Sequence, residues 1–139
     1  MWVGTASDGL LRLSANGDVR RLTTEDGFVN DIVESLLEDR DGRIWAGFRN
    51  AGGLCLLDGE AGVVKKCYSE KDGLPSSWIT DLLQTSDGKF WLATVKGLCL
   101  WQGEGGASVC KTYTEKNDLC DSALALAEDR DGNLWTGSR

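Results

Sequence analysis

The chain has 139 residues, of which 41% are hydrophobic and 27% are charged, so it is long enough to form one globular domain with its own core. Its formal net charge is −7, and its basic residues are scattered among more numerous acidic ones, which argues against a nucleic-acid partner. No apolar run approaches the roughly 18 residues that span a bilayer, so no membrane contact is expected for this segment.

A short sequence pattern that contains a tryptophan recurs along the chain, and the spacing of these tryptophans gives the length of the repeat. Tryptophan stands every 43 to 46 residues, at positions 2, 45, 91 and 135. A period of about 40 to 50 residues is typical of propeller blades or of helical pairs. We expect strands, because the middle copy divides into four short β-rich runs bounded by turn formers, at 78–85, 89–94, 97–102 and 108–114. Four antiparallel strands in one repeat are typical of a β-propeller blade.

In chain order, the sequence predicts an all-β chain of about three four-stranded antiparallel blades. Residues 1–38 form a partial blade and the innermost strand of the next, residues 31–73 and 77–117 each form a blade, and residues 122–139 begin another. A closed propeller usually has at least about four blades. We therefore expect an incomplete ring, which is either a fragment of a longer protein or a unit that joins further copies head to tail.

An Asp-Gly pair precedes three of these tryptophans, at Asp41 and Gly42, at 87–88 and at 131–132. Both residue types adopt positive φ, so we expect tight hairpins between the first and second strands of each blade. The tryptophans then lie on second strands, where they pack between neighbouring sheets rather than bind a ligand. A calcium loop is the alternative to these turns, but the further ligands of an EF-hand are missing.

The five cysteines form no CxxC pair and the sequence has no histidine, so no metal site and no cofactor are expected. Cys55 and Cys99 occupy the same place in successive copies, where small buried side chains fit. Pairing of Cys99 with Cys110 across a hairpin is the alternative. Because the sequence also has no nucleophile elbow and no phosphate-binding glycine loop, we do not expect an enzyme.

Two stretches of the sequence resemble a known repeat family: "EKDGLPSSWITDLLQTSDGKFWLATVKGLCLW" at 70–101 and "ALALAEDRDGNLWTGS" at 123–138. They are similar to the two-component regulator propeller repeat. This resemblance implies the extracytoplasmic propeller of a bacterial hybrid sensor kinase, which senses nutrients such as glycans and passes the signal through a membrane. It also implies a periplasmic location, although the first residues do not have the pattern of a signal peptide.

Ligands of a propeller usually bind over the central channel, at the face made by the loops that enter the innermost strands and the loops that join second to third strands. We call this the loop face, and the side with the Asp-Gly turns the hairpin face. The candidate ligand-binding residues of the loop face are Asn30, Asp31, Arg49, Ser76, Ser77, Trp78, Lys96, Asp121 and Ser122.

Trp78 is the leading candidate, because it lies outside the repeated tryptophan position and stands beside two hydroxyl groups. An aromatic face with polar groups around it suits a sugar ring. The alternative is that Trp78 packs against the neighbouring blade and that the Ser, Asn and Asp residues only cap turns.

The sequence therefore predicts a ligand-binding sensor segment that recognises a small molecule or an oligosaccharide for signal transduction. The expected partners are that ligand, and either the remaining propeller blades or further copies of the chain. One alternative is a structural or protein-interaction propeller module, assembling by its open blade edges. Another is a propeller lyase or hydrolase.

Overall fold

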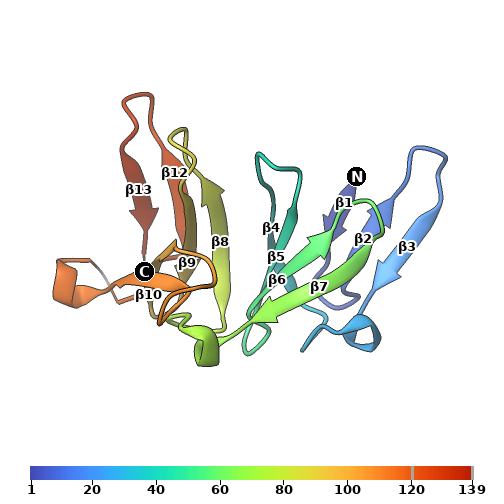
Figure 1. Cartoon of the computed structure of the whole chain (residues 1–139), viewed down its shortest axis with the longest axis horizontal. Coiled ribbons are helices and arrows are strands. Elements are labelled where there is room, and N and C mark those ends of the chain that lie inside the picture. Colours follow the sequence, from blue (N-terminus) through green and yellow to red (C-terminus); the bar gives the residue numbers. More distant parts are fainter. Residues whose placement is uncertain (120, 139) are drawn as a thin grey trace.

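The computed structural model describes every residue except 120 and 139. Among the described residues, thirteen strands form four antiparallel sheets, and each strand pairs with its neighbour in the chain. The sheets stand side by side like blades, and their hairpin tips point to one side of the molecule (Figure 1). The predicted all-β architecture of propeller blades in an incomplete ring is confirmed.

The second and third sheets are complete four-stranded blades, and the first and fourth are smaller. The first sheet contains β1 (Trp2–Gly4), β2 (Leu10–Leu13) and β3 (Val19–Leu22). The second contains β4 (Val33–Glu38), β5 (Ile44–Phe48), β6 (Leu54–Asp58) and β7 (Val63–Tyr68). The third contains β8 (Ile79–Gln84), β9 (Phe90–Thr94), β10 (Gly97–Trp101) and β11 (Cys110–Tyr113). The fourth contains β12 (Ala125–Glu128) and β13 (Leu134–Gly137).

Short 3-10 helices follow the outermost strands of the first three sheets. They are η1 (Thr24–Asp26), η2 (Glu70–Asp72) and η3 (Glu115–Asn117). In the part of the chain that the structure describes, no helix is long and apolar enough to cross a membrane.

The Asp-Gly hairpins form where the sequence predicts them, but only the glycine adopts positive φ. Gly42, Gly88 and Gly132 have φ of 76°, 87° and 82°, whereas the preceding aspartates do not have positive φ. The expectation that both residues share this conformation was wrong. In the first of these turns the N–H of Gly42 donates to the carbonyl of Asp39, and a single left-handed glycine is enough to close it.

The repeated tryptophan of the second sheet packs between the two complete blades, as predicted. The side chain of Trp45 is 2% exposed. Its ring centroid lies 5.2 Å from that of Phe90 and 5.3 Å from that of Trp101, both in the third sheet. At the fourth sheet, which has only two described strands, the corresponding Trp135 is 64% exposed. Burial of this position therefore depends on the neighbouring blade.

Each of the first two sheets also forms a hydrogen bond to the next sheet, at the loop between the third and fourth strands of that blade. Arg12 Nη1 of the first sheet donates to the carbonyl oxygen of Glu60 at 2.8 Å. The hydroxyl of Tyr68, in the second sheet, donates to Glu104 Oε1 at 2.7 Å. These polar contacts join consecutive blades, and Tyr68 is at the same time part of the apolar core.

Candidate functional site

The loop face is shaped by the three 3-10 helices, of which η1 and η2 lie at the lower edge of the molecule in Figure 1 and η3 at its left side. A capping box begins η1: Thr23 N donates to Asp26 Oδ2 at 2.8 Å, and Thr23 Oγ1 accepts a hydrogen bond from Glu25 N at 3.3 Å. Equivalent boxes begin η2 and η3. Each helix ends at a left-handed residue, Gly27, Gly73 or Asp118, which turns the chain toward the next innermost strand.

The main ion pair of the loop face joins Arg49, just after β5, to Glu34 in β4. Arg49 Nε and Nη2 donate to the two carboxylate oxygens of Glu34 at 2.7 and 3.0 Å. Glu34 stands at a β-bulge, where the register with β5 shifts between Val33 and Ser35, and bulges redirect side chains in this way. The hydrogen bonds and the charge of Glu34 raise the pKa of Arg49 above its ordinary value.

Trp78 lies next to this ion pair, under the guanidinium group. Arg49 Cζ is 5.7 Å from the centroid of the Trp78 ring, a cation–π distance. Trp78 is half-buried, and its Nε1 atom is buried without a hydrogen-bond partner among the described residues. The ring therefore packs against a side chain of the neighbouring blade, as the alternative interpretation expected, while part of it remains exposed at the loop face.

A recess of 220 Å³ lies beside the ion pair, between the first and second sheets. Glu34 and Arg49 border it together with smaller residues: Gly4, Thr5, Ala6, Ile32 and Val33. Ala6 and Ile32 take the places in the repeat that Arg49 and Trp78 take one blade later. The recess therefore corresponds to the space that the guanidinium and the indole fill between the second and third sheets.

A larger cleft of 480 Å³ lies on the hairpin face. Its lining includes Arg43 and Lys65, which form ion pairs with Asp39 at 2.7 Å and with Asp58 at 3.8 Å. Ligand sites are usually apolar concavities with a few polar groups, and this cleft has the opposite composition. We therefore place the candidate site at the smaller recess.

Glu70 organises a second polar group on the loop face. Its Oε1 atom accepts a hydrogen bond from Ser77 N at 3.2 Å and lies 3.8 Å from Lys96 Nζ. Its N–H donates to Ser77 Oγ at 3.1 Å. The Lys96 side chain is 64% exposed, so this pair lies at the surface and is worth little to stability.

Three of the candidate residues hold the loops themselves. Asn30 Nδ2 donates to the carbonyl of Arg49 at 2.8 Å. Asp31 Oδ1 accepts from Thr24 N at 2.8 Å, and Ser76 Oγ accepts from Trp78 N at 3.1 Å. These are the turn-capping contacts that the alternative interpretation expected.

The structure places Asp121, which is exposed, and Ser122, which is half-buried, in the loop before β12. Of the candidate residues, it brings Arg49 to Trp78 and to Asn30 and, through Glu70, Ser77 to Lys96. No group of three or more metal-binding side chains occurs among the described residues.

Sequence reasoning missed Glu34 and Glu70, although both organise the loop face. Glu34 lies 15 residues before its partner Arg49, and nothing in a single sequence connects the two. The repeat offers only a weak indication, since Thr80 takes the place of Glu34 one blade later and also makes a polar contact, to the carbonyl of Ala123.

Comparison with known proteins agrees with this geometry. The model of the two component regulator propeller family matches residues 26–50, 73–96 and 119–139. These ranges cover half of the chain and coincide with the connection, innermost strand and second strand of successive blades. The chain belongs to the two-component regulator propeller family. No curated protein matches it significantly.

Solved structures share the fold at low sequence identity. The extracellular domain of the hybrid two-component system BT3049 from B. thetaiotaomicron is 24% identical with a TM-score of 0.80, and the match covers 97% of this chain and 18% of that domain. The corresponding domain of BT4673 from the same organism is 18% identical with a TM-score of 0.77, covering 97% and 20%. Virginiamycin B lyase from Staphylococcus aureus is 15% identical with a TM-score of 0.71, covering 97% and 44%. The chain thus spans about a fifth of the sensor domains that it matches.

Proposed function

We propose that this segment is part of an extracytoplasmic sensor propeller and that its loop face recognises a small molecule or an oligosaccharide. The observation that carries the proposal is the Arg49–Glu34 pair, which borders the 220 Å³ recess and lies against Trp78. Membership of the two-component regulator propeller family and the likeness to extracellular sensor domains support the signalling role.

The chemistry of the loop face favours an uncharged ligand with many hydroxyl groups. The two ion pairs, Arg49 with Glu34 and Lys96 with Glu70, cancel in charge but offer both donors and acceptors. The apolar side chains of the recess and the exposed part of Trp78 suit the C–H surface of a sugar ring. A strongly anionic or cationic ligand would have to displace one partner of an ion pair.

Titration calorimetry of the whole chain against a panel of neutral oligosaccharides tests the proposal. We expect Trp78→Ala and Arg49→Ala to weaken the affinity for any binding sugar by about tenfold each, the range for truncating a central contact residue. Trp135→Ala and Arg130→Ala remove the same residue types away from the loop face and should leave affinity unchanged. Full affinity in both loop-face variants would discard this site, and turnover of a sugar would favour the lyase or hydrolase alternative.

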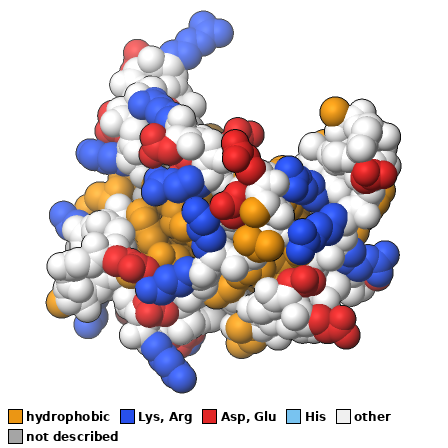
Figure 2. Space-filling view, turned by 45° about the vertical axis from the view of Figure 1, so that its right-hand side comes forward, with side chains coloured by type: hydrophobic (Ala, Val, Ile, Leu, Met, Phe, Trp, Pro, Cys, Tyr) orange, Lys and Arg blue, Asp and Glu red, His pale blue; other side chains and the backbone are white. Residues whose placement is uncertain are grey.

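Apolar surface around the fourth sheet favours a second role, contact with further blades. A recess of 240 Å³ beside β13 is lined mostly by apolar side chains: Trp91, Leu98, Tyr113, Leu119, Leu134 and Thr136. On the face of the molecule shown in Figure 2, apolar side chains also gather between charged ones, without being confined to this sheet. We propose that another blade covers this recess, either from a longer parent protein or from a second copy. Light scattering separates the two, because a monomer at high concentration excludes the second copy.

A further inference from the structure

Each complete blade contains a disulfide between its third and fourth strands. Cys55 in β6 is bonded to Cys67 in β7, and Cys99 in β10 is bonded to Cys110 in β11. The pairing of Cys99 with Cys110, left open by the sequence, is present, whereas that of Cys55 with Cys67 was not foreseen. Cys55 and Cys99 were expected to be small buried side chains. Both are buried, but each is one half of a covalent cross-link.

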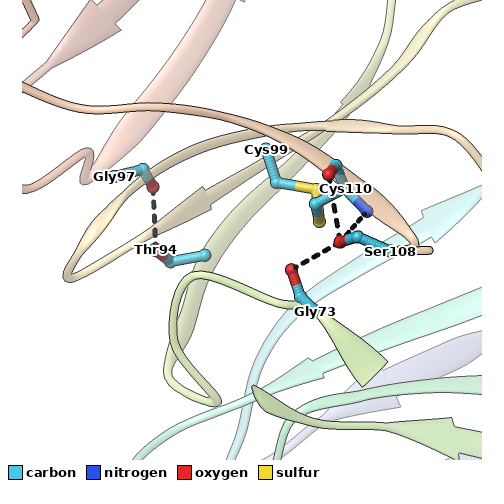
Figure 3. Close-up of a disulfide and its surroundings, with 6 residues drawn as sticks. All are labelled: Gly73, Thr94, Gly97, Cys99, Ser108 and Cys110. Carbon is cyan, nitrogen blue, oxygen red and sulfur yellow. Dashed lines mark hydrogen bonds between the residues drawn. A yellow bond between two sulfur atoms is a disulfide. The ribbon is translucent and has the colours of Figure 1, made fainter. Parts of the chain in front are cut away.

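The first disulfide contacts the connection that enters its blade, and the second is linked to the corresponding connection through the residues that precede Cys110. Cys67 Sγ lies 3.9 Å from the carbonyl oxygen of Gly27, the left-handed residue that ends η1. Because a disulfide sulfur carries no hydrogen, this is a packing contact and not a hydrogen bond. Gly73 takes the place of Gly27 one blade later, and it lies beside the second disulfide, as Figure 3 shows.

In the third sheet the link to the connection is made by hydrogen-bonding residues, because Ser108 and Val109 directly precede Cys110. Ser108 Oγ accepts from Cys110 N at 3.2 Å, and its hydroxyl has two acceptors within reach, the carbonyl oxygens of Cys110 at 3.1 Å and of Gly73 at 3.3 Å (Figure 3). Val109 N donates to the carbonyl of Asp72 at 3.1 Å. A Cβ atom on Gly73 would lie 2.0 Å from Ser108 Oγ, so only glycine permits this approach. The start of β11 is therefore attached to the end of η2.

The same connection carries the candidate site. Glu70, in η2, exchanges hydrogen bonds with Ser77, and Ser77 directly precedes Trp78. A continuous set of contacts thus runs from the Cys99–Cys110 bond through Ser108 to residues 69–78 of the loop face.

We propose that the Cys99–Cys110 disulfide is a positioning cross-link for the 69–78 connection, and that its oxidation state controls how firmly Ser77 and Trp78 are held on the loop face. Oxidation joins the two thiols with loss of two protons and two electrons to a disulfide oxidant. A dithiol reverses it, supplying both and becoming a cyclic disulfide. The cross-link requires an oxidising compartment, consistent with an extracytoplasmic sensor. The consequence for ligand affinity rests on the proposed function, whereas the consequence for the connection does not.

Hydrogen exchange read by mass spectrometry tests the proposal on the whole chain. Two double variants are matched, Cys99→Ser with Cys110→Ser and Cys55→Ser with Cys67→Ser. Cys120, outside the described residues, is replaced by Ser in every sample to prevent disulfide exchange. We expect the first pair to speed amide exchange in 69–78 and at Val109 by about tenfold and to leave 23–32 unchanged. The second pair should affect 23–32 and leave 69–78 unchanged.

An unchanged exchange rate in 69–78 in the first double variant overturns the proposal. An equal increase of the exchange rate in 23–32 and in 69–78, in either double variant, also overturns it, because it would indicate a general loosening of the fold. If the first double variant does not fold, Ser108→Ala tests the same link with both disulfides intact. It should also speed exchange in 69–78, and an unchanged rate overturns the proposal.

Calorimetry with an oligosaccharide that binds the oxidised chain then tests the consequence for affinity. We expect binding to weaken by about tenfold in the first double variant and to stay the same in the second. If no oligosaccharide binds the oxidised chain, the proposed function fails, while the exchange data still decide whether the disulfide positions the connection.

Discussion

The carboxylate of Asp39 accepts a hydrogen bond from Nε1 of the buried Trp45 at 2.8 Å, and thereby ties a hairpin turn to the core between two blades. The same carboxylate accepts from Asp41 N, Arg43 N and Arg43 Nε at 2.7 to 3.0 Å. Asp129 repeats the arrangement with Trp135 in the fourth sheet. The repeated Asp-x-Asp-Gly-x-x-Trp phrase is therefore a single hydrogen-bonded unit in which one aspartate orders both the turn and the indole.

Replacing Asp39 by Ala should destabilise the chain by about 2 to 4 kcal/mol, because the change leaves several buried or half-buried donors without an acceptor. Asp129→Ala removes the same contacts at an exposed site, where water replaces them, and should cost clearly less. Urea unfolding followed by tryptophan fluorescence measures both. An equal decrease in the free energy of unfolding of the two variants would show that the hydrogen bond to the buried indole contributes no more to stability than the exposed one.

Acid should weaken the fold through Asp39. Burial alone raises the pKa of its carboxyl, but hydrogen bonds from Trp45 and Arg43, and the Arg43 charge, together lower that pKa below its ordinary value of 3.8. A carboxyl with a pKa depressed by folding stabilises the protein above its unfolded pKa, and the contribution disappears as the pH falls through the folded pKa. We therefore expect the urea concentration at the midpoint of unfolding to decrease as the pH is lowered below about 4.

The matched variant for this prediction is Asp39→Asn, which does not ionise. Its stability should change less with pH below about pH 4 than that of the native chain, although other carboxylates still titrate. One of these is Asp129, where hydrogen bonds from Trp135 and Asn133 lower the pKa to about 2. Parallel stability curves for the two proteins would exclude Asp39 as a source of the acid sensitivity.

The blades were predictable because their determinants are local and repeated: glycine at each hairpin, and an indole three residues later. The Asp39 role was not, since Thr85 stands at that place in the third sheet and hides the pattern. The disulfide of Cys67 was not predicted, because the two blades place the second cysteine at different positions of the fourth strand. Cys67 lies directly opposite Cys55, whereas Cys99 lies opposite Thr112 and is bonded diagonally to Cys110. The repeat therefore aligns only one half of each disulfide.

Of the candidate site, the sequence predicted which loops share a face, since this follows from blade topology alone. It did not predict which side chains meet there. Arg49 reaches Glu34 because of a β-bulge, and Ser77 is fixed by Glu70. Bulges and contacts between side chains on different loops depend on tertiary packing, and no periodic pattern records them.

Gly73→Ala should destabilise the chain by about 2 kcal/mol or more, because φ of 105° strains any L side chain and the new Cβ would collide with Ser108. Gly17→Ala is the matched control. Gly17 has φ of 90° and open space around it, so only backbone strain of about 1 kcal/mol applies. Thermal and urea unfolding of both variants measures the difference. A Gly73→Ala loss no larger than that of Gly17→Ala would mean that the approach to Ser108 is not tight.

Alkali should weaken the contact between the second and third sheets at Tyr68. This side chain is 6% exposed, and burial, followed by its hydrogen bond to Glu104, raises its pKa well above the ordinary value of 10.0. A phenol kept neutral by folding stabilises the protein fully below its unfolded pKa, and the contribution is lost as the pH rises from there toward the folded pKa. The urea concentration at the midpoint of unfolding should therefore decrease as the pH is raised above about 10.

The matched variant is Tyr68→Phe, which lacks the ionisable group. It should be about 1 kcal/mol less stable than the native chain at pH 7, because the hydrogen bond is lost, but it should lose less stability in alkali. An equally steep alkaline loss in Tyr68→Phe would assign the effect to another group.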